Sequence, residues 1–385
     1  MNIVHIVDYI QPKLGYQEYF LAKEHSRMGH TVTVVTSDRY GNFPDYDNTI
    51  YPVLGDRIVG AGQWQCDGFK IIRLKTDLEI GAKVWLRGLS MAIQNLKPDV
   101  VICHGMTNLY ALQVAAMKKK LRFRLIYDDH TLPAIADSGR LRGLFYRLFD
   151  FAGIVRNADK IIGIADECIE VIVEKYKVPR EMVQMIPLGA DTEHFVFNEK
   201  LRADFRKQFG ISDDKIVITY TGRMNLDKAP HNIIIAVDNI RNRLTKNVVL
   251  MFVGNMEENY KNVFETHRRV VKDFANVITI PAVENAELVR VYSASDICAW
   301  PMQATASTIE ALSCGLPVIC VDVVSERCKN QNGIAVKAGD IGGLSKAILK
   351  LVNNDGLRTA MGRRSRDLAE KELSWKIIAA RFLEE

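Results

Sequence analysis

The chain lacks the sequence features of several protein classes. It has no run of about 18 apolar residues, the length that a membrane-spanning helix needs. Its seven cysteines are odd in number and form no C-x-x-C pair, which disfavours a disulfide framework or a structural zinc site and fits a reducing cytoplasm. The opening sequence MNIVHIVDYI has no basic leader and no cleavage site, so we expect a first strand there.

Two ligand-binding motifs are missing or misplaced. The first predicted strand leads to QPKLGYQ rather than to G-x-G-x-x-G, which disfavours a nicotinamide dehydrogenase. The D-x-D match Asp45-Tyr46-Asp47 lies in residues 38–68, a stretch rich in Gly, Pro, Asp and Asn that we interpret as a long loop. We regard this match as chance and expect no metal requirement and no bound cofactor. The net charge of +5 is mild, and we expect no nucleic-acid partner.

Positive charge is concentrated in two segments of the first half, residues 117–124 and 138–156. The second segment places leucines and phenylalanines at helical spacing, with arginines between them. This pattern is typical of an amphipathic helix on an anionic membrane surface, which would make the protein peripheral on the inner face of the membrane. A helix that covers its own sheet and exposes its arginines fits the pattern as well, so both interpretations stay open.

The length and the hydrophobic pattern predict two α/β domains. At 385 residues the chain exceeds one ordinary core, and its 48% hydrophobic and 25% charged residues are globular values. Short β-branched runs alternate with amphipathic helices, the pattern of parallel sheets covered by helices. The predicted strands cover residues 2–8, 31–36, 69–74, 98–103, 122–127, 160–164, 182–187, 215–222, 248–254, 276–281, 296–301 and 317–320.

Turn residues and weak periodicity place the linker between the domains in residues 187–200. We therefore expect an N-terminal domain at 1–190 and a C-terminal domain at 191–373. The last segment, 374–385, is amphipathic and could pack on either domain, including back on the first. The predicted helices of the second half cover residues 229–243, 257–274, 284–294, 305–314, 341–353 and 355–371.

The segment 297–320 predicts a buried strand that ends at Pro301, a short loop, and a helix that begins near Thr305. Small hydroxyl residues crowd the first turn of this helix: Thr305, Ser307 and Thr308. Such a helix start is suited to an anion, and Glu310, one turn further on, could hold a polyol such as a ribose. An ordinary strand, loop and helix with a solvated glutamate is the alternative.

Two cations follow the first strand of the second half. Gly222 ends the strand, Arg223 comes next, and Lys228 lies five residues further, just before the next helix. Together they could neutralise a diphosphate leaving group, although cations at loop tips are commonly solvated. Gly254, which ends VVLMFVG, would add backbone room near the same strand ends.

A series of short motifs is spread over nearly the whole chain. In order they are Gly15-Tyr16-Gln17-Glu18, Gly29-His30-Thr31-Val32-Thr33-Val34, Asp159-Lys160-Ile161-Ile162, Pro187-Leu188-Gly189-Ala190-Asp191, Gly222-Arg223 with Lys228, Ala294-Ser295-Asp296, residues 310–319, and Asn332-Gly333 with Gly339-Asp340. Their order and spacing resemble the GT-B glycosyltransferases, specifically the large retaining family 4 of nucleotide-sugar transferases. The resemblance implies two Rossmann-like parallel-sheet domains that face one another across a cleft.

The resemblance also implies roles for residues of this chain. Arg223 and Lys228 would bind the donor's phosphates and stabilise the leaving group, and Glu310 would hold the ribose hydroxyls. Backbone N–H groups of 304–307 would meet the diphosphate. The further donor-binding residues that the resemblance implies are Gly15, Tyr16, Gly222, Gly254, Ala282, Val283, Met302, Gln303, Ala304, Thr305, Ala306 and Ser307, of which Ala282 and Val283 would line the base.

Two histidines are candidates in the first domain. His130, which ends LIYDDH, lies where the family places a histidine near the reacting sugar, so we assign it a catalytic role. A capping or core histidine is the alternative. His104, which ends VVICH, is a second candidate, for which a core role is favoured.

Three positions depart from the family pattern. Met302 stands where the first of two glutamates, which touches the donor sugar, is usual, and a thioether accepts hydrogen bonds only weakly. Tyr16 replaces the second glycine of the first loop, and Leu188 replaces an asparagine. Met302 leaves three outcomes open: an altered donor choice, a slow enzyme, or a non-catalytic relative.

We expect a hexosyltransferase of class EC 2.4 that retains configuration and needs no metal. Its co-substrate would be a nucleoside-diphosphate sugar, linked to UDP or GDP, and its acceptor a glycan, a lipid-linked or another hydroxyl compound, as in polysaccharide biosynthesis. A non-catalytic GT-B-like nucleotide-binding or scaffold protein and a GT-B nucleotide-sugar epimerase are the alternatives.

Overall fold

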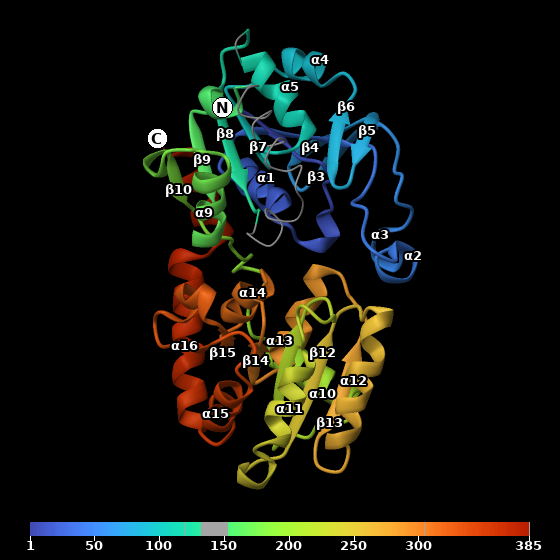
Figure 1. Cartoon of the computed structure of the whole chain (residues 1–385), viewed down its shortest axis with the longest axis vertical. Helices are drawn as coiled ribbons and strands as arrows, with labels where there is room; N and C mark the ends of the chain where they lie inside the picture. Colours follow the sequence, from blue (N-terminus) through green and yellow to red (C-terminus); the bar gives the residue numbers. More distant parts are fainter. Residues whose placement is uncertain (119, 132–152, 304, 385) are drawn as a thin grey trace. The chain divides into compact units, whose positions relative to one another are not determined.

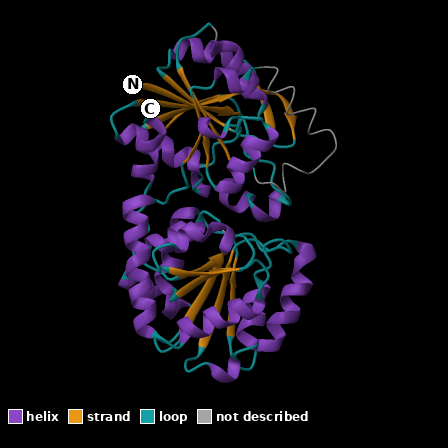
Figure 2. Ribbon diagram, turned by 60° about the vertical axis from the view of Figure 1, so that its left-hand side comes forward, coloured by secondary structure: helices purple, strands orange, loops and turns teal. Residues whose placement is uncertain are grey.

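The computed structural model describes residues 1–118, 120–131, 153–303 and 305–384. The chain divides into two compact units: unit 1 consists of Met1–Leu188 and Trp375–Glu385, and unit 2 of Gly189–Ser374. In each unit, helices cover the faces of a central sheet (Figure 2). The predicted fold class, α/β with two Rossmann-like parallel-sheet domains, is confirmed.

Unit 1 contains a sheet with the strand order β10-β9-β8-β7-β1-β2-β4-β3, of which Figure 1 labels β10, β9, β8, β7, β4 and β3. β3 runs antiparallel to β4, and the other neighbours are parallel. The strands are β1 (Asn2–Ile6), β2 (Thr31–Ser37), β3 (Gly62–Cys66), β4 (Phe69–Leu74), β7 (Val100–His104), β8 (Arg124–Asp129), β9 (Lys160–Gly163) and β10 (Val183–Met185), with a separate hairpin of β5 (Thr76–Ile80) and β6 (Lys83–Leu86). The helices are η1 (Pro12–Leu14), α1 (Gln17–Arg27), α2 (Tyr46–Thr49), α3 (Tyr51–Leu54), α4 (Leu89–Leu96), α5 (Leu109–Lys118), α8 (Ile154–Asn157), α9 (Asp166–Lys175), η2 (Arg180–Met182) and α17 (Trp375–Leu383).

Both faces of this sheet are buried. Successive residues of a strand point to opposite faces, so Ile3 of β1 packs in the core beneath α1 and α17, and Val4 packs in the core beneath α4 and α5. Both side chains are fully buried. This double burial explains why the strands read as continuous apolar runs in the sequence.

The last helix, α17, packs on α1 of unit 1. Phe20 and Trp375 stack with their ring centroids 5.5 Å apart. The end of α17 is bound by two cations, because Lys160 Nζ donates to the carbonyl oxygen of Arg381 at 2.8 Å and Arg124 Nη1 donates to that of Leu383 at 2.7 Å. Positive charge at a helix C-terminus is stabilising.

Unit 2 contains a parallel sheet with the strand order β13-β12-β11-β14-β15-β16. The order reverses between β11 and β14, which is the switch point of a doubly wound sheet. The strands are β11 (Ile216–Thr221), β12 (Val248–Val253), β13 (Asn276–Ile280), β14 (Ile297–Trp300), β15 (Val318–Val321) and β16 (Gly333–Val336). The helices are α10 (Glu199–Gln208), α11 (His231–Asp238), η3 (Arg241–Arg243), α12 (Glu258–Val271), η4 (Asn285–Glu287), α13 (Leu288–Ala294), α14 (Ser307–Ser313), η5 (Asp322–Cys328), α15 (Ile341–Val352) and α16 (Asp355–Glu372).

The predicted long loop at 38–68 is wrong in part, because α2, α3 and β3 lie within it. β3 pairs with β4 through a tight turn at Asp67-Gly68, and both turn residues have positive φ angles, 44° and 88°. Asp-Gly is a strong hairpin signal, so the sequence did contain the information. The hairpin of β5 and β6 and the four-residue β16 are further strands that the pattern did not reveal.

Two further findings concern membranes. Among the described helices, none combines the length and the hydrophobicity that crossing a bilayer demands. Most of the basic segment 138–156 lies outside the described residues, so its two interpretations stay predictions.

Candidate active site

In unit 2 the candidate site lies at the carboxyl edge of the sheet, beside the switch point. Gly222 follows β11 and Gly254 follows β12, with φ angles of 138° and 144°. A Cβ atom on Gly254 would stand 2.0 Å from the carbonyl oxygen of Gly222. Only glycine fits, so the two loops meet backbone to backbone. Open α/β sheets bind their ligands at this edge.

The loop after β11 holds the two predicted phosphate-binding cations. The Tyr220 hydroxyl donates to the carbonyl oxygen of Arg223 at 2.8 Å, and Asn225 Oδ1 accepts from the Lys228 N–H at 3.0 Å. The Arg223 side chain is 52% exposed and lies 3.8 Å from the Glu257 carboxylate. Burial lowers the pKa of Lys228, and the positive charge of Arg223 lowers it further. The two cations thus act on each other, an arrangement that favours an anionic ligand.

Glu310, the predicted ribose-binding residue, is almost completely buried on α14. Asn285 Nδ2 donates to its Oε1 at 2.6 Å, and the Tyr292 hydroxyl lies 3.2 Å from its Oε2. Burial raises the pKa of Glu310 to about 7, because the two hydrogen bonds offset only part of the desolvation. The Tyr292 hydroxyl on α13 also lies 3.0 Å from Thr221 Oγ1, so this residue links Glu310 on α14 to the end of β11.

The loop after β14 differs in one respect from the prediction. α14 begins at Ser307 rather than near Thr305 and has seven residues, so its dipole is weaker than the sequence suggested. The carbonyl oxygen of Thr305 accepts from Arg327 Nη1 at 2.6 Å, which fixes the loop to η5. Within the described ranges, no group bonds to the buried Thr305 Oγ1. Ala304 lies outside the described residues.

The remaining predicted donor contacts of unit 2 lie in the same loops. Met302 is half-buried, and a Cβ atom on Gly339 would stand 3.7 Å from its sulfur. Gln303 is exposed, whereas Ala306 and Ser307 are half-buried at the start of α14. The predicted base-lining pair follows β13: the Ala282 N–H donates to Asn255 Oδ1 at 3.2 Å, and Val283 packs on the core of unit 2.

Unit 1 holds the other predicted residues. Gly15 ends η1 with a φ of 69°, and Tyr16 is 40% exposed just before α1. His130 has a 42% exposed side chain, and its Nε2 lies 3.2 Å from Asp128 Oδ2. His104 is buried, with one ring nitrogen facing a second histidine and the other facing Asp128, so the core role holds for it.

Sequence reasoning missed Asn285, Tyr292 and Arg327. Asn285 and Tyr292 bond to Glu310 from 25 and 18 residues away, and Arg327 bonds to the loop before α14. None of them belongs to a motif that points to Glu310 or to the loop before α14, so only the folded chain reveals their part.

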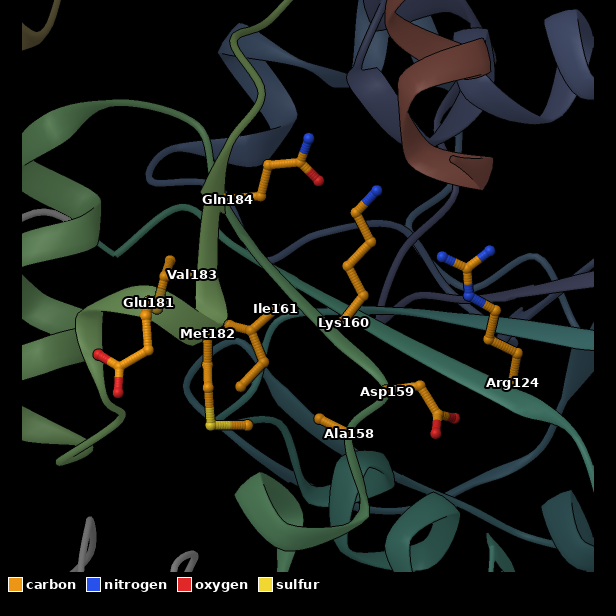
Figure 3. Close-up of a pocket in the computed structure, with 9 residues that line it drawn as sticks. All are labelled: Arg124, Ala158, Asp159, Lys160, Ile161, Glu181, Met182, Val183 and Gln184. Carbon is orange, nitrogen blue, oxygen red and sulfur yellow. The ribbon is translucent and has the colours of Figure 1, made fainter. Parts of the chain in front are cut away.

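A separate cavity of about 460 Å³ lies in unit 1, at the amino edge of its sheet, where β8, β9 and β10 begin (Figure 3). Its residues are Arg124, Ala158, Asp159, Lys160, Ile161, Glu181, Met182, Val183 and Gln184. Arg124 and Lys160 are the cations that bind the end of α17. This cavity therefore belongs to the docking of that helix, and it contains no predicted site residue.

Comparisons with known proteins agree with this architecture. The family model described as Glycosyl transferases group 1 matches residues 202–368, and the model described as Glycosyltransferase Family 4 matches residues 19–194. The D-inositol 3-phosphate glycosyltransferase of Corynebacterium jeikeium is 26% identical over 269 residues, which are 66% of this chain and 64% of that protein. The chain thus matches slightly less than two thirds of that relative's length.

Solved structures show the same fold at low sequence identity. The sucrose-phosphate synthase from Thermosynechococcus elongatus has a TM-score of 0.73 at 17% identity, and the match covers 98% of this chain and 96% of that one. HepE from Anabaena, in complex with UDP, has a TM-score of 0.73 at 14% identity, with 99% and 98% covered.

The raised pKa of Glu310 predicts a pH-dependent loss of stability. Its pKa is about 7 when folded against an ordinary value of 4.5, so the folded state binds more protons between these values. Stability is therefore lost as the pH rises from about 4.5 to 7. Glu310→Gln is neutral at every pH, and its free energy of unfolding relative to wild type should grow by about 2–3 kcal/mol from pH 5 to pH 8.

Urea unfolding of both proteins at the two pH values measures this change. Other groups titrate in the same range, such as Glu18, whose pKa burial also raises to about 7. Their contribution to stability is the same in variant and wild type, so it cancels in the difference. An equal difference at pH 5 and pH 8 would contradict the prediction.

Proposed function

Because the chain belongs to the GT-B glycosyltransferases of the family 4 type, we propose that it transfers a sugar from a nucleoside diphosphate to a hydroxyl acceptor, with retention of configuration. The observation that carries this proposal is the pairing of Arg223 and Lys228 at the switch-point edge of unit 2, beside the loop that leads to Glu310. The UDP complex of HepE supports a uridine diphosphate sugar as the first donor to test, with GDP sugars next.

The two cations would supply positive charge for the departing diphosphate. The bond between the anomeric carbon and the diphosphate breaks, and negative charge builds on the departing phosphate. Arg223 and Lys228 would offset that charge, without the need for a metal ion. The acceptor hydroxyl would attack from the face that the diphosphate leaves, and its proton would pass to a phosphate oxygen.

The acceptor is proposed only as a class. A glycan, a lipid-linked saccharide or another hydroxyl compound would fit, with a membrane-bound acceptor favoured by the basic and aromatic sequence of 138–156. A cytoplasmic protein at the inner face of the membrane is consistent with this class of acceptor.

Removal of either cation should abolish most turnover. We expect Arg223→Ala and Lys228→Ala to lower kcat by about 100-fold or more with an intact fold, because the leaving group then loses a fixed positive charge. The assay measures sugar transfer and free nucleotide diphosphate over a panel of UDP and GDP sugars. Lys246→Ala is the matched control, since Lys246 is a cation that precedes β12 at the opposite edge of the same sheet.

Near-normal rates in both variants would refute the phosphate role. If a nucleotide diphosphate protects the wild type from heat but no sugar moves and no donor is hydrolysed, the protein is a binding or scaffold relative. If an isomerised nucleotide sugar is the product, it is an epimerase.

Transfer should not depend on a divalent ion. Side-chain cations can neutralise the diphosphate by themselves, so the rate should change by less than about twofold after treatment with EDTA. The comparison is made between chelated protein and the same protein with added Mg²⁺ or Mn²⁺. Activity that disappears with EDTA and returns with one of these ions would overturn metal independence.

Met302 should influence the choice of donor. Met302→Glu would place a strong hydrogen-bond acceptor where the thioether now lies, so we expect a changed donor preference or a changed rate in the same panel. Met302→Leu keeps the volume and the apolar character and should leave the panel unchanged. An unaltered donor profile for Met302→Glu would show that this side chain does not face the sugar.

A further inference from the structure

Three buried histidines form one hydrogen-bonded line in unit 1: His25 on α1, His5 in β1 and His104 at the end of β7. His25 Nε2 lies 2.9 Å from the carbonyl oxygen of Ala379 on α17. His25 Nδ1 lies 3.1 Å from His5 Nε2, and His5 Nδ1 lies 3.0 Å from His104 Nε2. The line ends at Asp128, whose Oδ2 is 3.1 Å from His104 Nδ1.

The carbonyl oxygen of Ala379 determines which ring nitrogens along this line carry a proton. A carbonyl oxygen only accepts, so His25 carries its proton on Nε2 and must accept at Nδ1. His5 then donates from Nε2 and accepts at Nδ1, which makes His104 donate from Nε2. His104 Nδ1 faces a carboxylate and donates there too, so His104 is doubly protonated.

The electrostatics of the line agree with this assignment. Burial lowers the pKa of His25 to about 4 and that of His5 well below its ordinary value, which keeps both rings neutral. Burial alone would also lower the pKa of His104, but the charge and hydrogen bond of Asp128 raise it. His104, together with His130, holds the pKa of Asp128 well below its usual range in spite of burial.

Asp128 connects the line to His130. Its Oδ2 also accepts from Gln17 Nε2 at 2.8 Å and lies 3.2 Å from His130 Nε2. Three donors therefore converge on one carboxylate, and His130, with its exposed side chain, is the end that a ligand can reach. Because Nε2 is committed to Asp128, Nδ1 is the nitrogen through which His130 would act.

We propose that His25, His5 and His104 are positioning residues for His130: they hold a positive charge on His104, which neutralises Asp128 and fixes the ring and the protonation of His130. This inference rests on the proposed function, since it assigns the network to the sugar-transfer site. Its consequence is that a substitution at His5, which does not contact His130, changes the acid–base behaviour of His130.

Other charged groups face the same region. Glu18 on α1 and Asp8 after β1 act on His104, and Glu18, Asp129 and Asp128 act on His130. Burial raises the pKa of Asp8 to about 6 and that of Glu18 to about 7. These groups titrate in the wild type and in each variant of the test. A difference in the pKa of His130 between these proteins therefore reports a change in the histidine line.

The test is an NMR titration of the histidine rings in protein labelled with ¹⁵N-histidine. In the wild type at pH 7.5 we expect Nε2–H tautomers for His25 and His5 and a doubly protonated His104. In His5→Leu, His104 loses its acceptor and becomes neutral, so the charge of Asp128 acts on His130 alone and the pKa of His130 should rise by about 1.

Two further variants separate this effect from a general loss of structure. His5→Gln keeps one donor and one acceptor and should leave the pKa of His130 within about 0.3 of wild type. His25→Leu lets His5 adopt the opposite tautomer and donate to His104, so it should raise the pKa of His130 as His5→Leu does. In both leucine variants the acidic limb of the plot of kcat against pH should shift together with the pKa of His130.

A neutral His104 in the wild type, or an unchanged pKa of His130 in both leucine variants, would overturn the proposal. The titration needs neither donor nor acceptor, so it is independent of the transfer assay. If the pKa moves but no sugar is transferred, the network stands and the proposed function fails. If sugar is transferred and the pKa does not move, the network fails and the function stands.

Discussion

The candidate site of unit 2 depends on the backbone contact between Gly222 and Gly254, where any larger residue would clash. Thr221, the last residue of β11, is held from two further elements. The Trp300 Nε1–H on β14 donates to its carbonyl oxygen at 2.9 Å, and its Oγ1 lies 3.0 Å from the Tyr292 hydroxyl on α13. The end of β11 is thus fixed by a neighbouring strand and by a helix, and the position of the loop that follows is fixed with it.

The sheets were predictable because both of their faces are buried. A strand covered on two sides becomes a continuous apolar run rich in β-branched residues, and such runs stand out in the sequence at β11 and β12. β3 was missed because none of its residues is buried, so the strand has no apolar pattern and the Asp67-Gly68 turn was the remaining signal. β16 was missed because only one of its four residues is buried, whereas the equally short β9, β14 and β15 are buried throughout.

The candidate site was predictable only where its residues stand close together in sequence. Arg223, Lys228 and Glu310 belong to short motifs, so their positions could be proposed before the fold was known. Asn285 on η4 and Tyr292 on α13 bond to Glu310 because these two elements pack against α14. Hydrogen bonds between separate elements leave no local pattern, and the histidine line shows this most clearly, because its links span 20, 24, 99 and 354 residues.

Two buried carboxyls show how the surroundings decide the charge of a group. Glu310 and Asp128 are both removed from water, which favours the protonated form in each case. The partners of Glu310 are an amide and a phenol, whose neutral hydrogen bonds are too weak to restore its ordinary pKa. Asp128 faces an imidazolium, and the ionic contact outweighs the same desolvation. The neutral rings of His25 and His5 keep that imidazolium protonated, so a carbonyl oxygen at the far end of the line contributes to the charge of Asp128.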